Sequence, residues 1–298
     1  MNRIALGTAQ FGLDYGIGNT RGQISLTEGA AIIEFAKSHG MDTLDTAVAY
    51  GNSEQRLGQI GVPSWRIITK LPAVPADVEN VAEWIHATVS QSMARLHVAH
   101  LDGLLLHRPD QLLEPQGSEI CRALCDLKDH GLVRKIGVSI YDPAELDLLI
   151  DKVPIELVQA PFNLLDRRLE QSGWLSRMVD CGIEVHVRSI FLQGLLLMQP
   201  AARDGRFARW NPLWSALQRW SAGQALSPLE ACLAHVLSYP EISRIVVGVD
   251  SQNHLAEILN AANRTPQRAP SELASADVEL LNPALWHQLQ ANPLPSAP

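Results

Sequence analysis

The sequence predicts an α/β fold in which eight strand–helix pairs close into a (β/α)8 TIM barrel. Short apolar runs rich in β-branched residues alternate with longer helical patterns along the 298-residue chain, which favours a parallel sheet. Several of these runs, such as GLLLH and RIVVGV, are apolar without alternation, as expected for strands that are covered on both faces. No glycine-rich phosphate fingerprint follows an early strand, and this weakens the competing doubly wound open sheet.

Strands are expected where a short apolar run ends at a turn residue or before a helical pattern. In chain order we place them at Arg3–Gly7, Met41–Asp45, Arg66–Lys70, Leu101–His107, Val133–Ser139, Glu156–Gln159, Glu184–Arg188 and Arg244–Val247. The helical patterns between and after them lie at Ser25–His39, Ser53–Ile60, Asp77–Leu96, Gln116–His130, Pro143–Ile150, Arg168–Cys181, Ser227–Tyr239 and Ser251–Asn263. The first helix begins with a capping box, in which Ser25 precedes Glu28 by three residues, and Gly40 ends it.

Two regions do not fit the plain repeat. A long insertion, Phe191–Gly223, follows the seventh strand, and residues 264–298 form a C-terminal extension with a helix expected at Asp277–Leu289. The insertion carries three tryptophans, Trp210, Trp214 and Trp220. Long loops in a barrel often close over a substrate, and the alternative is that the tryptophans pack the insertion onto the barrel. No linker divides the chain, so we expect residues 1–298 to form a single barrel domain.

Composition and charge exclude several classes of partner. The net charge is -8, the pI is about 5.7 and no run of Lys or Arg occurs, so nucleic acid and anionic membranes are poor partners. No apolar run approaches the roughly 20 residues that span a bilayer, and MNRIALGTAQFG lacks the pattern of a secretory signal. We expect a cytoplasmic protein that is a monomer or a weak homo-oligomer. The cysteines lack metal-ligand spacing and are interpreted as small buried hydrophobes, so no metal site is predicted.

Four polar residues fall at or just beyond the ends of three successive predicted strands. Asp45 ends the second strand, and Tyr50 lies in the loop that follows it. Lys70 ends the third strand, and His107 ends the fourth. A (β/α)8 barrel builds its site at the C-terminal ends of strands about 4.8 Å apart, so these side chains can converge. Taken singly, each could be a turn cap, a solvated strand end or a packing residue, but their order at one end favours a shared site.

These four side chains suit the reduction of a carbonyl group. Tyrosine is a poor acid at neutral pH, and a lysine cation beside it stabilises the phenolate form. Asp45 would keep Lys70 charged and oriented, while a neutral His107 would orient the carbonyl or assist proton transfer. Tyr50 would then give its proton to an oxygen that becomes negative as hydride arrives at the carbon.

The sequence resembles the aldo-keto reductase family. The matching segments occur in family order over about residues 3–262, and they are LGTAQFG, DTAVAYGNSEQRLG, ITK, LLLHRPD, GLVRKIGVS, VQAPFNLLDRR and VVGVDSQNHLAEIL. The resemblance implies an NADP(H)-dependent reductase of aldehydes, ketones or sugars, with Asp45, Tyr50, Lys70 and His107 as the catalytic residues. Tyr50 would be the proton donor, and the nicotinamide would supply the hydride. The segments GTAQFGLDYGI and RSIFLQGLL look most like bacterial members.

The resemblance also implies positions that bind the cofactor. Ser139 and Gln159 match residues that hydrogen-bond the nicotinamide amide, and Ile140 stands where the family usually has asparagine. Arg188 replaces the aromatic residue that commonly lies under the nicotinamide ring, and a guanidinium can also stack on a ring face. The pyrophosphate is expected at the loops after strands seven and eight, at Ser189, Leu192, Gln193, Gly194, Gly248, Val249 and Ser251.

The largest departure from the family concerns the adenosine 2′-phosphate. Where the family usually has Lys or Arg, this chain has Asp250 and His254. A carboxylate repels a phosphate dianion and can instead accept hydrogen bonds from a free ribose 2′-hydroxyl. NADPH is the cofactor that the family implies, and NADH is the alternative, unless Asp250 only points to solvent or caps the helix. Glu257 matches an acidic residue near the adenine.

The substrate pocket is predicted from loops at the same end of the barrel. The candidates that could line it are Phe11, Tyr15, Arg21 and Arg108. An arginine that faces the pocket would favour an anionic or sugar-like carbonyl compound. The alternative is that Arg21 and Arg108 are solvated loop cations.

Two other functions remain open from the sequence. A barrel of this family can serve as a cofactor-sensing regulatory subunit that retains all four catalytic residues. A non-redox lyase or epimerase could use Lys70 as a Schiff base. Against this last function, Asp45 should keep Lys70 charged, whereas an amine nucleophile must be neutral.

Overall fold

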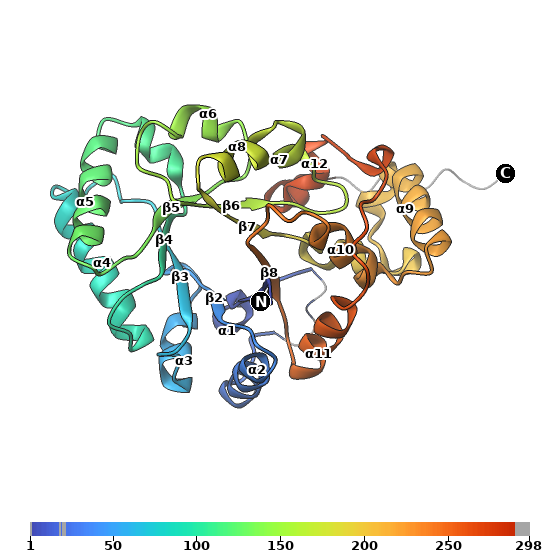
Figure 1. Ribbon diagram of the computed structural model, residues 1–298, viewed down its shortest axis with the longest axis horizontal. Helices are drawn as coiled ribbons and strands as arrows, with labels where there is room; N and C mark the ends of the chain where they lie inside the picture. The colour runs from blue at the N-terminus through green and yellow to red at the C-terminus, as the bar shows by residue number, and fades with distance from the viewer. Residues whose placement is uncertain (1, 18, 20–21, 290–298) are drawn as a thin grey trace.

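The strands form a closed parallel barrel in chain order (Figure 1), in a computed structural model that describes residues 2–17, 19 and 22–289. They are β1 (Ile4–Gly7), β2 (Thr43–Asp45), β3 (Arg66–Leu71), β4 (Gly103–Leu106), β5 (Ile136–Ser139), β6 (Leu157–Pro161), β7 (Glu184–Arg188) and β8 (Arg244–Gly248). Parallel pairing of β1 with β8 closes the ring, with Ile4 opposite Ile245. The predicted (β/α)8 TIM barrel is therefore confirmed.

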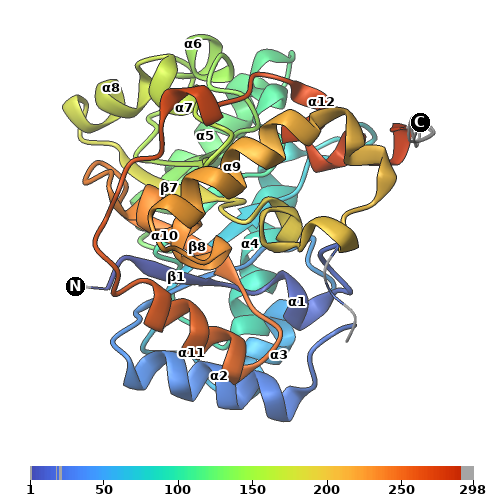
Figure 2. The ribbon, with the colours of Figure 1, turned by 90° about the vertical axis from the view of Figure 1, so that its right-hand side faces the viewer.

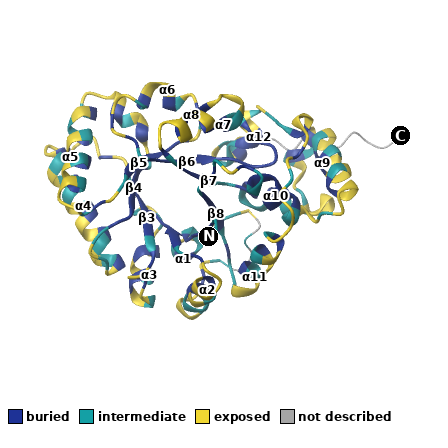
Figure 3. Ribbon diagram, viewed as in Figure 1, coloured by how far each residue is buried: buried dark blue, intermediate teal, exposed yellow. Residues whose placement is uncertain are grey.

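Helices form an outer ring around the strands, and their outward faces are exposed while the strands are buried (Figure 3). The helices of the barrel repeat are α2 (Leu26–Ser38), α3 (Ser53–Ile60), α4 (Val81–Leu96), α5 (Gly117–Asp129), α6 (Glu145–Leu149), α7 (Arg168–Gln171), α8 (Trp174–Asp180), α10 (Pro228–Leu237) and α11 (Gln252–Ala261). The remaining helices are α1 (Ala9–Gly12), α9 (Asn211–Gly223) and α12 (Val278–Leu281), with 3₁₀ turns η1 (Pro109–Leu113), η2 (Leu192–Leu197), η3 (Pro200–Ala202), η4 (Gly205–Trp210), η5 (Ser271–Leu273) and η6 (Pro283–Gln288). Within the described residues, no helix has both the length and the apolar character to span a membrane.

The interior of the barrel is filled by side chains, and the pocket described below opens at its end. Ile68, Leu105 and Leu157 form an apolar cluster of their own, separate from the main core that lies between strands and helices. Lys70 and Gln159 follow Ile68 and Leu157 by two residues, and side chains two residues apart on a strand face the same way. The apolar cluster thus forms the layer beneath the polar residues at the C-terminal end of the barrel.

Two predicted helices are divided in the structure. The pattern at Arg168–Cys181 becomes α7 and α8, because Gly173 between them adopts a left-handed φ of 79° that ends one helix and starts the next. The pattern at Asp277–Leu289 becomes α12 and η6, because Pro283 lacks the N–H that a continuous helix would use. Apolar periodicity passes through both breaks, so it could not reveal them.

The insertion after β7 and the C-terminal extension pack on each other beside the barrel (Figure 2). The indole Nε1 of Trp210 donates a hydrogen bond of 3.0 Å to Asp277 Oδ2, just before α12. Trp286 packs edge-on against Phe207, with ring centroids 5.1 Å apart. Trp214 is buried, in agreement with the packing interpretation of the tryptophans. Residues at the start of the insertion also reach the pocket described next.

Candidate active site

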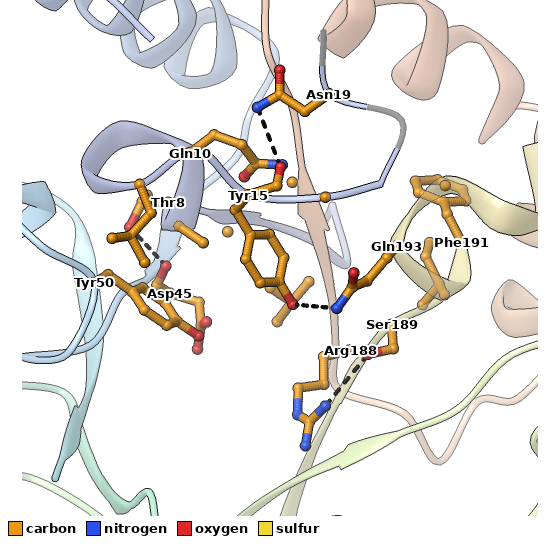
Figure 4. Close-up of a pocket in the computed structure, with 18 of the residues that line it drawn as sticks. Thr8, Gln10, Tyr15, Asn19, Asp45, Tyr50, Arg188, Ser189, Phe191 and Gln193 are labelled. Atoms are coloured by element: carbon orange, nitrogen blue, oxygen red, sulfur yellow. Dashed lines mark hydrogen bonds between the residues drawn. The ribbon is translucent and has the colours of Figure 1, made fainter. Parts of the chain in front are cut away.

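A pocket of about 620 Å³ opens at the C-terminal end of the barrel (Figure 4). Its wall is built from the ends of the strands and the loops that follow them, as expected for this fold. The predicted residues that line it are Tyr15, Asp45, Tyr50, Lys70, His107, Ser139, Arg188, Ser189, Gln193, Gly194, Gly248, Asp250 and His254. The structure therefore brings all four predicted catalytic side chains into one cavity.

Asp45 ends β2 and is almost fully buried. Its carboxylate Oδ1 lies 2.7 Å from Lys70 Nζ, and its Oδ2 accepts a hydrogen bond of 2.6 Å from Gln159 Nε2. Its backbone carbonyl accepts hydrogen bonds of 2.9 Å from both the amide and the hydroxyl of Thr8. Both carboxylate oxygens thus have partners, which lets the charge persist away from water.

Lys70, on β3, is 1% exposed and holds its ammonium group in a fixed place. Besides the ion pair with Asp45, Nζ donates a hydrogen bond of 2.9 Å to the carbonyl of Thr46. Burial acts to lower the pKa of Lys70, but its interactions with the Asp45 carboxylate and with Tyr50 outweigh burial and raise the pKa above its usual value. Lys70 is therefore a cation at neutral pH, which speaks against its use as a Schiff-base nucleophile.

Tyr50 lies in the loop after β2 and meets both Lys70 and His107. Lys70 Nζ lies 5.1 Å from the centroid of the Tyr50 ring. The rings of Tyr50 and His107 meet edge to face, with centroids 6.0 Å apart and an interplanar angle of 81°. The backbone of Tyr50 is fixed by the end of α1, since a Cβ at Gly12 would lie 1.7 Å from the Tyr50 carbonyl oxygen.

His107 follows β4 and is neutral at neutral pH. Burial, together with the nearby cations Lys70 and Arg188, lowers the pKa of His107 to about 4. A neutral imidazole offers one donor and one acceptor nitrogen. His107 can therefore donate a hydrogen bond to a carbonyl oxygen without carrying a charge of its own.

Ser139 and Gln159 lie opposite each other on β5 and β6. Ser139 lines the pocket, and Gln159 is fully buried beside it with its amide nitrogen committed to Asp45. The other amide atom, Oε1, is buried and has no hydrogen-bond partner within the described part of the chain. A buried acceptor without a partner is costly, so a ligand with an N–H group at this place would satisfy it.

Arg188, at the end of β7, contacts residues of the β5 loop. Its Nη2 donates a hydrogen bond of 2.9 Å to the carbonyl of Ile140, and Nη1 lies 3.3 Å from Ser189 Oγ. Its guanidinium carbon sits over the ring of Tyr141, 4.5 Å from the centroid. The guanidinium is thus stacked on an aromatic face of the protein and also borders the pocket.

The loop after β7 has an unusual backbone. Ser189, Leu192 and Gln193 have positive φ values of 59°, 47° and 53°, and Gly194 has a φ of 93°. Non-glycine residues in this region are strained and cluster at functional sites. Ser189, Gln193 and Gly194 line the pocket, whereas Leu192 turns inward and is fully buried in the core. Leu192 is thus not brought to the pocket surface.

The predicted residues after β8 are only partly brought to the pocket. Gly248, Asp250 and His254 line it, and His254 Nδ1 lies 3.3 Å from Asp250 Oδ1. Val249 is buried in the core instead. Ser251 caps α11 by accepting a hydrogen bond from the backbone of His254. Glu257 lies farther along α11, exposed and outside the pocket lining.

Of the predicted substrate residues that the structure describes, only Tyr15 lines the pocket, where its hydroxyl lies 3.4 Å from Gln193 Nε2 (Figure 4). Phe11 is buried on α1 and packs toward Gly29 of α2, so its prediction as a pocket residue needs correction. Arg108 also needs correction, because it is exposed and forms a bidentate pair with Asp110 outside the pocket. Arg21 lies outside the described residues.

Several residues that line the pocket were not predicted from the sequence. The backbone of Gly248 is covered by the Gln10 amide, because a Cβ at Gly248 would lie 2.7 Å from Gln10 Nε2. The segment GTAQFG, whose Gly7 ends the first strand, was the available signal, since the loop that follows this strand must also open at the catalytic end. The other missed residues are Gly7, Thr8, Ala9, Leu13, Gly16, Asn19, Ala49, Tyr141, Ile190, Phe191, Leu197, Met198 and Val246.

Known proteins of similar sequence are oxidoreductases. A sequence model of the aldo/keto reductase family matches residues 3–273 of this chain. The protein "Uncharacterized oxidoreductase YqkF" of Bacillus subtilis (strain 168) is 26% identical over 285 residues, which cover 88% of this chain and 92% of that protein. A 6-dehydroglucose reductase of Novosphingobium aromaticivorans is 26% identical over 249 residues, which cover 77% of this chain and 79% of that protein.

Solved structures show the same fold at lower sequence identity. The holo form of the aldo-keto reductase AKR11C1 from Bacillus halodurans has a TM-score of 0.72 and 20% identity, with 97% of this chain and 93% of that chain covered. The glycerol dehydrogenase AKR11B4 from Gluconobacter oxydans has a TM-score of 0.70 and 21% identity, with 100% of this chain and 95% of that chain covered. Both comparisons agree with a complete (β/α)8 barrel.

Proposed function

The chain belongs to the aldo-keto reductase family, and from this we propose that it uses NAD(P)H to reduce an aldehyde, ketone or sugar carbonyl to an alcohol. One observation carries the proposal. A buried ion pair between Asp45 and Lys70 lies directly beside the Tyr50 ring, whose edge-to-face neighbour is a neutral His107. This set offers a proton and a hydrogen bond to one oxygen atom at the mouth of the barrel.

In this proposal Tyr50 is the general acid. Its hydroxyl gives a proton to the carbonyl oxygen as that oxygen gains negative charge, and Lys70 stabilises the phenolate that remains. Asp45 is a positioning residue, because its carboxylate holds the Lys70 ammonium in place at 2.7 Å. His107 donates a hydrogen bond to the same carbonyl oxygen and fixes its direction.

The pocket residues fit a nicotinamide dinucleotide. The unpartnered Gln159 Oε1 can accept a hydrogen bond from the carboxamide of a nicotinamide, and Ser139 beside it supports the same group. Residues of the β7 loop, with Ser189, Gln193 and Gly194 on the pocket wall, would hold the pyrophosphate. When bound, the reduced nicotinamide would supply the hydride that goes to the carbonyl carbon. The nicotinamide ring itself would then carry a positive charge.

We further propose that NADH is accepted at least as well as NADPH. The Lys and Arg residues that line the pocket within the described chain are Lys70 and Arg188, and both lie at the catalytic end. Near the start of α11 the wall instead carries Asp250, paired with His254. A carboxylate there repels a 2′-phosphate and accepts a hydrogen bond from a free 2′-hydroxyl.

Substitution of Tyr50 tests the proposed acid. Tyr50→Phe keeps the ring but removes the proton, so turnover of a reducible aldehyde should fall by roughly 10²–10⁴-fold. The dissociation constant of the reduced cofactor, measured by fluorescence titration, should stay close to the wild-type value.

Tyr141→Phe is the matched control, because Tyr141 also lines the pocket and its ring contacts Arg188. This variant should keep turnover near the wild-type level. Wild-type turnover in Tyr50→Phe would show that another group supplies the proton.

A further inference from the structure

Arg188 is a pocket cation that has no carboxylate partner among the described residues. Its hydrogen bonds go to the carbonyl of Ile140 and the hydroxyl of Ser189, which are both neutral. The face of its guanidinium is covered by the ring of Tyr141. No Asp or Glu within the described residues lies at ion-pair distance from it, in contrast to Lys70, whose charge is balanced by Asp45 at 2.7 Å.

Arg188 stands across the pocket from the proposed acid. Figure 4 shows Tyr50 and Arg188 on opposite sides, with Tyr15 between them. This agrees with the barrel order, in which β2 and β7 are separated by β1 and β8. If Tyr50 and His107 hold the carbonyl oxygen of the substrate, the opposite side of the pocket, next to Arg188, is free for the nicotinamide ring that gives up the hydride.

We propose that Arg188 makes the pocket hold the oxidised cofactor less tightly than the reduced cofactor, and so promotes release of the oxidised form after each turnover. The inference rests on the proposed function. In the balanced reaction the cofactor C–H bond breaks, a C–H bond forms at the carbonyl carbon, and the carbonyl oxygen takes its proton from Tyr50. The ring is neutral before this step and carries one positive charge after it.

The physical reason is repulsion between two cations in a partly buried place. The guanidinium group of an arginine carries a permanent positive charge in proteins. Repulsion over a few ångströms is weakly screened when solvent is largely excluded. The two cofactor forms share the same adenosine and pyrophosphate, so contacts to those parts cancel when their affinities are compared. The charge of Lys70 contributes less to the difference, because Asp45 neutralises it.

The ratio of two dissociation constants tests the proposal. NAD⁺ and NADH, or NADP⁺ and NADPH if these bind better, are titrated into the wild type, Arg188→Gln and Arg188→Lys with tryptophan fluorescence as the readout. In the wild type the oxidised form should bind more weakly than the reduced form. Arg188→Gln should lower the ratio of the dissociation constant of the oxidised form to that of the reduced form on the order of tenfold, because the oxidised form binds more tightly. Arg188→Lys keeps the charge and should keep the ratio.

Arg188→Lys and one further variant are the controls that separate the effect of charge from that of structure. Arg108→Gln removes an exposed cation outside the pocket and should leave the ratio unchanged. Loss of the Arg188 hydrogen bonds to Ile140 and Ser189 weakens both cofactor forms alike, so it does not move the ratio.

The contrary outcomes are distinct. Equal binding of both forms to the wild type, or an unchanged ratio in Arg188→Gln, would overturn the role of Arg188 while leaving the proposed reductase intact. A selective rise in KM for anionic substrates in Arg188→Gln, with the ratio unchanged, would make Arg188 a substrate site instead. A wild type that binds neither form would remove the proposed function and this inference together.

Discussion

At the scale of single residues, Asp45 connects the two halves of the pocket. One oxygen binds Lys70 on the side of the proposed acid, and the other binds Gln159 on the side of the proposed nicotinamide site. Its backbone is in turn held by Thr8 from the loop after β1. A change at Asp45 therefore disturbs both the proposed proton donor and the proposed carboxamide site.

Asp45→Asn should destabilise the fold strongly. It leaves the buried Lys70 ammonium without a counter-charge, and breaking a buried pair in this way costs about 3–5 kcal/mol. Urea denaturation measures the free energy of unfolding. Asp110→Asn is the matched control, since the Arg108–Asp110 pair is exposed and should contribute only about 0–1 kcal/mol. Equal losses of unfolding free energy in the two variants would show that the buried pair stabilises the fold no more than the exposed pair.

His107 should make stability depend on pH in the acid range. Its pKa is 6.5 as a free group and about 4 in the folded protein, so between these values only the unfolded chain binds the proton. The free energy of unfolding therefore falls as the pH drops from about 6.5 towards 4, and this loss is absent above that window. His107→Gln should lose less stability over the same range, as measured by urea denaturation at several pH values. A variant with the wild-type pH dependence would contradict the lowered pKa.

The residues predicted from the sequence reach the pocket where strand geometry decides the direction of a side chain. Asp45 is the last residue of β2 and Lys70 the penultimate residue of β3, so the alternation of strand side chains and the position of barrel sites direct both side chains to the pocket. Phe11 and Arg108 lie in a short helix and a loop, where no such period applies. Phe11 went to the core, and Arg108 found Asp110 as a local partner.

At the scale of elements, α1 fixes the loop that carries Tyr50. This four-residue helix directly follows β1, and its last residue, Gly12, touches the backbone of Tyr50 and Ser53. A side chain at Gly12 would collide with the Tyr50 carbonyl. The backbone of Gly12 thus packs closely against the loop that carries Tyr50.

Gly12→Ala should lower turnover by displacing Tyr50. The added methyl group has no space, and a shift of about 1 Å in a reacting group can cost on the order of 10²-fold in rate. Steady-state kinetics measures the effect. Gly223→Ala at the end of α9 is the control, because a Cβ there meets nothing within 4 Å. Full activity in Gly12→Ala would mean that the loop adjusts freely and that α1 does not position Tyr50.

Element boundaries were predicted best where a cap residue marks them. Ser25 and Ser227 begin α2 and α10 as expected, because each side chain accepts the backbone N–H three residues later. The helix expected from Asp77 begins only at Val81, after Asn80 supplies the cap. The short helix α1 has no apolar period and no side-chain cap, so the sequence carried no signal for it.

At the scale of the whole molecule, the barrel could be predicted from the alternation of strands and helices alone. The arrangement of the insertion and the C-terminal extension could not, because it depends on contacts between distant segments. The carboxylate of Asp277 accepts a hydrogen bond from the indole of Trp210, and the carbonyl of Trp286 accepts a hydrogen bond from Arg206. These contacts hold the segment whose first residues line the pocket, and so join the C-terminal extension to the site.

Cofactor titration tests the central claim most directly, because it needs no knowledge of the substrate. The purified protein is titrated in parallel with NADH and NADPH while tryptophan fluorescence is followed. The proposed function predicts saturable binding in the micromolar range, with NADH at least as tight as NADPH because Asp250 lines the pocket near the start of α11, where we propose that the adenosine ribose binds. Binding of NADPH alone would contradict the role of Asp250. Binding of neither would contradict the assignment of this pocket to a nicotinamide-dependent reductase.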